Sequence, residues 1–107
     1  MTDVDSDDFD DARRAMADAL HRTMKIVNRK GLHARATAKF VQCVDRFEAE
    51  IRVTRGGETV GGDSIMGILT LGAGLGSTIL VSASGEDAEQ ALDALEELVG
   101  NRFGEDE

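Results

Sequence analysis

The segment Gly31-Leu32-His33-Ala34-Arg35-Ala36 places a histidine and an arginine directly after a glycine. The apolar spacing that follows predicts a helix over residues 33–46, so His33 stands at or just before its first residue. The N–H groups of a first helical turn have no intrahelical acceptor, and together with the positive dipole end they bind phosphate. Arg35 adds a permanent cation. Because imidazole can form covalent intermediates, this pattern is typical of a histidine that accepts a phosphoryl group, although a surface residue or helix cap is the simpler alternative.

The other side chains with reactive potential have no such surroundings. His21 precedes the first predicted strand with no glycine turn or neighbouring helix start, and we interpret it as incidental. Cys43 is the only cysteine, so no intrachain disulfide can form, and inside a helical pattern we interpret it as a small filler residue. Two histidines and one cysteine at wide separation show no metal-ligand spacing, and we expect neither a metal nor a cofactor.

Length and charge exclude several classes of protein. The 107 residues are enough for one modest core, and the net charge of −9 disfavours nucleic acid as a partner. The sequence contains no apolar run of about 18 residues, so we expect no membrane insertion, and its acidic start does not resemble a secretory signal. We therefore expect a cytoplasmic protein. Residues 22–55 nevertheless hold nine Lys or Arg against three acids, so this part of the chain could attract an anionic protein surface or a phosphate.

Hydrophobic periodicity predicts an alternation of strands and helices. We expect strands at residues 22–28, 50–54, 58–60 and 77–83, and helices at 33–46, 65–71 and from about Ser84 to Val99. Gly56-Gly57 predicts a two-residue hairpin, Ser84 is the expected N-cap of the last helix with Asp87 three residues on, and Gly100 is its expected stop. The order β-α-β-β-α-β-α predicts an α+β open-faced sandwich, in which three helices cover one face of a four-stranded antiparallel sheet.

The chain divides into three parts by composition. Residues 1–21 predict an acidic N-terminal extension that is either disordered or a marginal helix, because acids come first and bases later. Residues 22–100 contain the predicted strands and helices of the compact domain. Residues 101–107 read as an acidic C-terminal tail.

Two segments carry a resemblance to a known family. Asn28-Arg29-Lys30-Gly31-Leu32-His33-Ala34-Arg35 resembles the active-site segment of HPr, the histidine phosphocarrier of the bacterial phosphotransferase system. Ser64-Ile65-Met66-Gly67-Ile68-Leu69-Thr70-Leu71-Gly72 resembles the family's regulatory-serine helix. Both segments occur in the expected order on the expected elements.

The resemblance implies a function and a set of partners. It implies that Enzyme I, charged by phosphoenolpyruvate, phosphorylates His33 on Nδ1, with Arg35 and the helix N-terminus holding the group, and that an enzyme IIA protein receives it. It implies that HPr kinase/phosphorylase acts on Ser64. The implied partner surface consists of the residues Thr37, Ala38, Ile65, Met66 and Leu69. Such a protein is a phosphoryl-transfer carrier, not a free-standing enzyme, and we expect a monomer because its site must face successive partners.

Two departures from the family pattern bear on the function. Ala36 replaces the usual proline after the active-site arginine, and Asp63 places an acid directly before Ser64. These departures lean towards a divergent or nitrogen-type branch of the family. The alternative function is a regulatory protein-interaction module with the same fold, in which phosphorylation at His33 or Ser64 is a signal. The loop 72–76 is glycine-rich but precedes a strand, which disfavours nucleotide binding.

Overall fold

The computed structural model describes residues 4–107 as four helices, four strands and one short 3₁₀ turn. The strands are β1 (Leu20–Lys25), β2 (Glu50–Arg55), β3 (Glu58–Gly61) and β4 (Thr78–Ser84). The helices are α1 (Val4–Ala15), α2 (Ala34–Val44), α3 (Ile65–Leu71) and α4 (Ala88–Gly100), followed by the turn η1 (Arg102–Gly104). The predicted order β-α-β-β-α-β-α is therefore confirmed for the compact domain.

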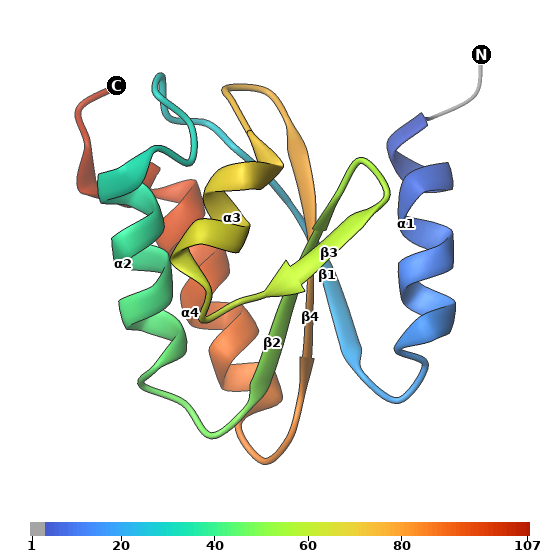
Figure 1. Ribbon diagram of the computed structural model, residues 1–107. Helices are drawn as coiled ribbons and strands as arrows, with labels where there is room; N and C mark the ends of the chain where they lie inside the picture. Colours follow the sequence, from blue (N-terminus) through green and yellow to red (C-terminus); the bar gives the residue numbers. More distant parts are fainter. Residues whose placement is uncertain (1–3) are drawn as a thin grey trace.

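The strands form one antiparallel sheet in the order β1-β4-β2-β3 (Figure 1). Thr23 of β1 pairs with Leu80 of β4, and Val53 of β2 pairs with Val81 of the same strand. The turn between β2 and β3 has Gly56 at φ +59° and Gly57 at φ +81°. Two consecutive positive φ values define the type I′ turn that matches strand twist, which confirms the predicted hairpin.

The main core lies between this sheet and α2, α3 and α4 (Figure 1). Each strand contributes alternate residues to it, and α2 and α4 contribute one apolar face each. Its largest fully buried side chains include Phe40, Ile68, Ile79, Leu92, Leu95 and Phe103. The predicted α+β sandwich is confirmed, and it places α2 with its first turn at one end of the sheet.

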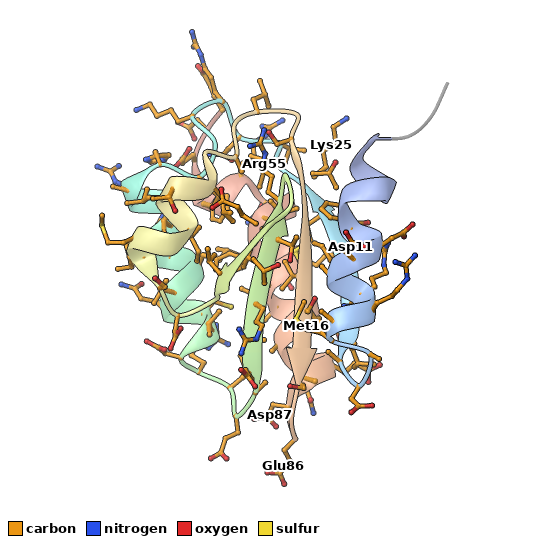
Figure 2. All side chains as sticks on the ribbon, turned by 45° about the vertical axis from the view of Figure 1, so that its right-hand side comes forward. Asp11, Met16, Lys25, Arg55, Glu86 and Asp87 are labelled. Carbon is orange, nitrogen blue, oxygen red and sulfur yellow. The ribbon has the colours of Figure 1, made fainter. Side chains whose placement is uncertain are left out.

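Helix α1 covers the opposite face of the sheet. Phe9 and Ala12 are buried against Leu80, a β4 residue whose neighbours Ile79 and Val81 belong to the main core. Met16 packs against the same small cluster and lies between the end of α1 and the strands (Figure 2). The sheet therefore has helices on both faces, and β4 is buried from Ile79 to Ala83 for this reason.

The last helix begins later than the sequence predicts. Ser84 is the last residue of β4 and not a helix cap, because Gly85 turns the chain at φ +115° before α4 begins at Ala88. Asp87 occupies the N-cap position, but its Oδ2 accepts a hydrogen bond from the backbone N–H of Glu48 at 2.8 Å. Gly100 is the final residue of α4, and the cap is Asn101.

Residues 102–107 run back along the molecule to the loop before α2 (Figure 1). Phe103 is buried in the main core, and Lys39 Nζ of α2 donates a hydrogen bond to its carbonyl oxygen at 2.7 Å. The backbone N–H of Arg29 donates to the carbonyl of Glu107 at 2.6 Å. Within residues 4–107, no helix combines the length and apolar character needed to cross a membrane.

Candidate functional site

His33 is the N-cap residue of α2, as the sequence predicts. Its backbone is extended (φ −78°, ψ −178°), and its carbonyl accepts the first intrahelical bond, from Thr37 N–H at 2.8 Å. Its imidazole makes no capping bond to the helix. The N–H groups of residues 34–36 therefore have no acceptor within the helix and remain available to an anion beside the ring.

The loop before His33 is held by tight backbone contacts. Gly31 has φ +66°, and a Cβ atom at this residue would lie 2.5 Å from the carbonyl oxygen of Ala73. Leu32 N–H donates to the same carbonyl at 2.9 Å. The side chain of Asn28, fully buried, donates from Nδ2 to the carbonyl of Gly31 at 2.8 Å. These contacts fix the chain immediately before the histidine, and only glycine is compatible with them at residue 31.

Cationic and acidic side chains both surround the histidine. An open hollow of about 790 Å³ is lined by Arg29, Lys30, His33, Ala34, Arg35, Glu105, Asp106 and Glu107. Arg35 is exposed and forms no ion pair within the part of the chain that the structure describes. Lys25 and Arg55 lie at this end of the molecule, whereas Glu86 and Asp87 lie at the far end (Figure 2). Arg35 and the unbonded N–H groups of the first turn of α2 can therefore bind an incoming anion, although Glu105, Asp106 and Glu107 add negative charge to the same hollow.

Sequence reasoning missed one residue of the site, Glu105. Its Oε2 lies 2.6 Å from His33 Nε2, and its Oε1 accepts a hydrogen bond from Asn28 Nδ2 at 3.1 Å. The hydrogen bond to His33, followed by that from Asn28, lowers the pKa of the Glu105 carboxyl below its ordinary value. The contact spans 72 residues of sequence. The sequence held one signal for this contact, because residues 105–107 are acidic and the segment around His33 is basic.

The residues predicted to form a partner surface do not all reach the surface. Ile65 and Met66 of α3 are 43% and 71% exposed, Leu69 is half-buried, and Ala38 is half-buried on the neighbouring helix α2. The prediction that Thr37 belongs to this surface is wrong. Thr37 is fully buried, and its Oγ1 donates to the carbonyl of Leu32 at 3.2 Å, so it stabilises the loop before His33.

Ser64 caps the short helix α3. Its Oγ accepts a hydrogen bond from the backbone N–H of Gly67 at 3.0 Å, and the residue is half-buried. Asp63 beside it is exposed. The N-cap geometry thus places Ser64 directly before the exposed apolar residues Ile65 and Met66.

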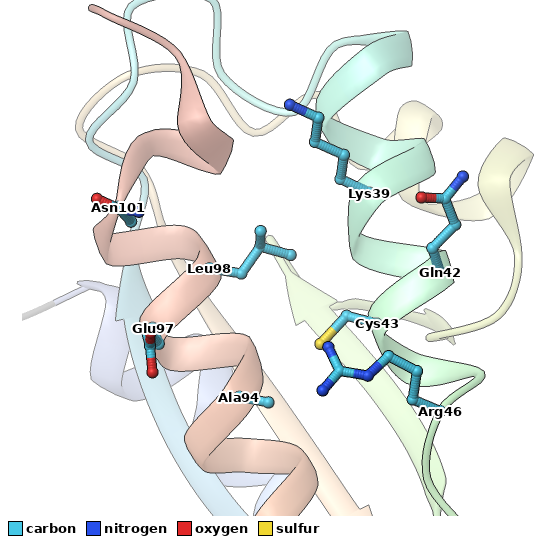
Figure 3. A pocket seen from close by; sticks show the side chains of 8 residues that line it. All are labelled: Lys39, Gln42, Cys43, Arg46, Ala94, Glu97, Leu98 and Asn101. Atoms are coloured by element: carbon cyan, nitrogen blue, oxygen red, sulfur yellow. The ribbon is translucent and has the colours of Figure 1, made fainter.

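The other reactive side chains lie away from His33. Cys43 is buried, and burial raises the pKa of its thiol despite the nearby Arg46. It faces a shallow groove between α2 and α4, opposite Ala94 and Leu98 (Figure 3). His21 links Met16 O and Ser82 Oγ at 3.0 and 2.8 Å. Across residues 4–107, no cluster of three or more His, Cys, Asp or Glu could hold a metal ion.

Comparison with known proteins assigns this arrangement to a family. The family model described as "PTS HPr component phosphorylation site" matches residues 20–101. The chain is 46% identical over 88 residues to the phosphocarrier protein HPr of Cupriavidus necator, covering 82% of this chain and 99% of that protein. It is 41% identical over 86 residues to the phosphocarrier protein NPr of Shewanella violacea, covering 80% of this chain and 94% of that protein.

A solved structure supports the same assignment. The crystal structure of HPr-C-His from Thermoanaerobacter tengcongensis superposes with a TM-score of 0.79 at 41% identity, covering 82% of this chain and 99% of that chain. The residues of α1 lie outside the segment that the family model matches.

Proposed function

The chain belongs to the HPr family of phosphocarrier proteins of the phosphotransferase system, and on this premise we propose that it carries a phosphoryl group on Nδ1 of His33. Phospho-Enzyme I, charged from phosphoenolpyruvate, is the proposed donor, and an enzyme IIA protein is the proposed acceptor. We propose a cytoplasmic monomer, since both partners must reach one open site.

One observation supports this function above the others: an imidazole stands at the N-terminus of α2 with unbonded N–H groups beside it. In the transfer step, the Nδ1 lone pair attacks phosphorus while the bond to the donor nitrogen breaks, and the donor keeps that electron pair. Phosphoryl transfer depends mainly on positioning and on stabilising charge at the phosphoryl oxygens. The N–H groups of residues 34–36 and the guanidinium of Arg35 would supply this stabilisation.

The proposed docking surface is the exposed apolar part of α3 with the adjacent residue of α2. It comprises the residues Ala38, Ile65, Met66 and Leu69. Helices α2 and α3 pack side by side, so these residues belong to two neighbouring helices (Figure 1). Methionine suits a surface that must accept more than one partner, because its side chain is flexible and polarizable.

Ser64 is the proposed site of regulatory phosphorylation by an HPr kinase/phosphorylase. A phosphate there would add about −2 charge beside Ile65 and Met66, and the carboxylate of Asp63 would repel it. Exposure of the chain to the kinase and ATP, with Ser64→Ala as the control, tests this proposal by the gain in mass. Asp63→Asn should then accept the phosphate faster than the natural chain.

The central experiment measures the intact mass of the chain after incubation with Enzyme I and phosphoenolpyruvate. An acid-labile gain of one phosphoryl group (about 80 Da) is expected. His33→Ala should abolish the gain, whereas His21→Ala, the matched control at the other histidine, should keep it. No gain with an active Enzyme I would overturn the carrier function and favour a regulatory interaction module.

A further inference from the structure

Glu105 contacts the proposed phosphoryl-accepting ring from the side opposite to Nδ1. Its Oε2 lies 2.6 Å from Nε2 of His33, and its Oε1 takes a hydrogen bond of 3.1 Å from Asn28. The Glu105 and His33 side chains are 18% and 28% exposed. Both carboxylate oxygens are therefore engaged, and the carboxylate cannot rotate freely against the ring.

The groups that hold Glu105 are themselves fixed. Asn28 is fully buried, and its Nδ2 is shared between Glu105 and the carbonyl of Gly31. On the C-terminal side, Phe103 is buried in the main core, and Glu107 bonds to the backbone and side chain of Arg29 at 2.6 and 2.7 Å. The terminal segment is thus anchored both before and after Glu105.

The lowered pKa of Glu105 makes it a carboxylate at neutral pH. A carboxylate has no proton to donate, so in this contact Nε2 must carry the hydrogen. When the ring is neutral, hydrogen on Nε2 leaves the lone pair on Nδ1. For metal-binding histidines, loss of a carboxylate that orients the imidazole in this way typically lowers metal affinity or activity by about 10- to 100-fold. We expect a rate effect of the same order for His33.

We propose that Glu105 is a positioning residue for phosphoryl transfer, a role that rests on the proposed function of His33. It holds the Nε2–H, which fixes the ring orientation and leaves the Nδ1 lone pair for attack. When Nδ1 bonds to phosphorus and the donor nitrogen leaves with its electron pair, Nε2 keeps its proton and the His33 ring becomes cationic. The Glu105 carboxylate neutralises that charge.

The test compares Glu105→Ala, Glu105→Gln and the control Glu86→Gln, which makes the same change at an exposed glutamate at the end of the molecule far from His33 (Figure 2). The nitrogen resonances of the His33 ring in the unphosphorylated protein report which nitrogen carries the hydrogen. At a pH where the ring is neutral, the natural chain and Glu86→Gln should show hydrogen on Nε2 alone. Glu105→Ala should show a mixture of both forms, and Glu105→Gln, whose amide oxygen still accepts, should keep hydrogen on Nε2.

The rate of phosphorylation by phospho-Enzyme I provides the second readout. We expect kcat/KM to fall by about 10-fold or more in Glu105→Ala and by less in Glu105→Gln, with Glu86→Gln unchanged. Ring resonances and rates that do not differ between Glu105→Ala and the natural chain would overturn the proposal. A natural chain that accepts no phosphate overturns the carrier function instead, and the ring resonances then still decide whether Glu105 orients His33.

Discussion

Arg35 is the side chain whose role at the site can be separated most cleanly from stability. It is exposed on the first turn of α2 and has no ion-pair partner among residues 9–107, whose side chains the structure describes. Removing it should therefore leave the free energy of unfolding within about 0.5 kcal/mol of the natural value. Any loss of transfer rate can then be assigned to the reaction.

We predict that Arg35→Ala lowers the rate of phosphorylation by phospho-Enzyme I about 10- to 100-fold, because a charge-assisted donor to the phosphoryl oxygens is lost. Arg35→Lys should give an intermediate rate, since lysine keeps the charge without the planar fork of donors. Rapid-quench measurement of phosphohistidine formation tests both variants. Equal rates for Arg35→Ala and the natural chain would mean that Arg35 takes no part in phosphoryl transfer.

The Glu105 contact should make docking of the C-terminal segment depend on pH. Its folded pKa is lowered, chiefly by the hydrogen bond with His33, so the carboxylate stabilises docking at pH values above its unfolded pKa of about 4.3. That stabilisation is lost as the pH falls through the lower folded value. Amide hydrogen exchange and chemical shifts of Phe103 and Gly104, followed from pH 6 to pH 2, should show this release.

A matched pair of variants identifies the group responsible for the transition. Glu105→Gln should abolish the acid transition in the Phe103 and Gly104 signals, because an amide does not titrate. Glu107→Gln should keep it, since the backbone bond from Arg29 N–H to the Glu107 carbonyl, which helps to anchor the segment, does not depend on the Glu107 side chain. A transition that survives in Glu105→Gln would show that another acid controls docking.

Among the elements, the loop before α2 depends on one glycine more than on any side chain. Gly31 has a positive φ, and a Cβ atom would lie 2.5 Å from Ala73 O and 2.7 Å from Gly74 Cα. Both obstacles are backbone atoms, so neither can move aside cheaply. We predict that Gly31→Ala destabilises the fold by about 3 kcal/mol or more, from backbone strain and overpacking together.

Gly57→Ala is the matched control for this prediction. Gly57 also has a positive φ, +81°, but nothing lies within 4 Å of its added Cβ. It should therefore cost only the backbone strain, about 1–2 kcal/mol. Urea unfolding of both variants measures the difference. Equal losses in the free energy of unfolding would mean that the backbone at Ala73 moves to accommodate the added Cβ.

Helix α3 should depend on Ser64 for its start. Ser64→Ala removes the only side-chain acceptor for Gly67 N–H and should lower the free energy of unfolding by about 1 kcal/mol. Ser64→Thr keeps a hydroxyl oxygen at the cap and should lose much less. Thermal unfolding distinguishes them, and equal losses for the two variants would mean that the cap bond contributes little.

The local sequence pattern was sufficient to predict most elements and the position of His33 at a helix start. It was not sufficient where a residue contacts a partner far away in the sequence. The strands were predicted to within about three residues because alternate residues face the core, and the His33–Arg35 segment because a glycine turn precedes a helix. The start of α4 could not be predicted, since Asp87 bonds to Glu48 instead of capping. Glu105 was missed and Thr37 was assigned to the surface because the contacts that define both residues appear only after folding.

At the scale of the whole molecule, the same limit applies to α1. Acidic residues 1–11 predict either disorder or a marginal helix, and nothing nearby indicates a partner for Phe9. The partner is Leu80, a residue of β4 that faces away from the main core. The continuous apolar run Ile79-Leu80-Val81 is typical of a strand covered on both faces, and it was the sequence signal that a further element covers β4.

Because α1 lies on the face opposite α2 and α4, it should contribute to stability without affecting the reaction. We predict that deleting residues 1–17 lowers the free energy of unfolding by about 2 kcal/mol, the value for burying one large apolar side chain. Phosphorylation by phospho-Enzyme I should stay within about 2-fold of the natural rate, because none of residues 9–15, the part of α1 whose side chains the structure describes, lines the hollow around His33. Urea unfolding and the phosphorylation assay measure the two quantities.

Phe9→Ala extends this prediction. The free energy of unfolding that it removes cannot exceed the contribution of the docked helix α1. A core Phe→Ala change ordinarily costs about 3–5 kcal/mol, but here the helix can detach once Phe9 is gone. The variant should therefore lose no more stability than the deletion. Arg14→Ala, which removes only the exposed pair with Asp11, should lose less than about 0.5 kcal/mol. A loss in Phe9→Ala well above that of the deletion would mean that α1 unfolds together with the sheet and is part of one cooperative domain.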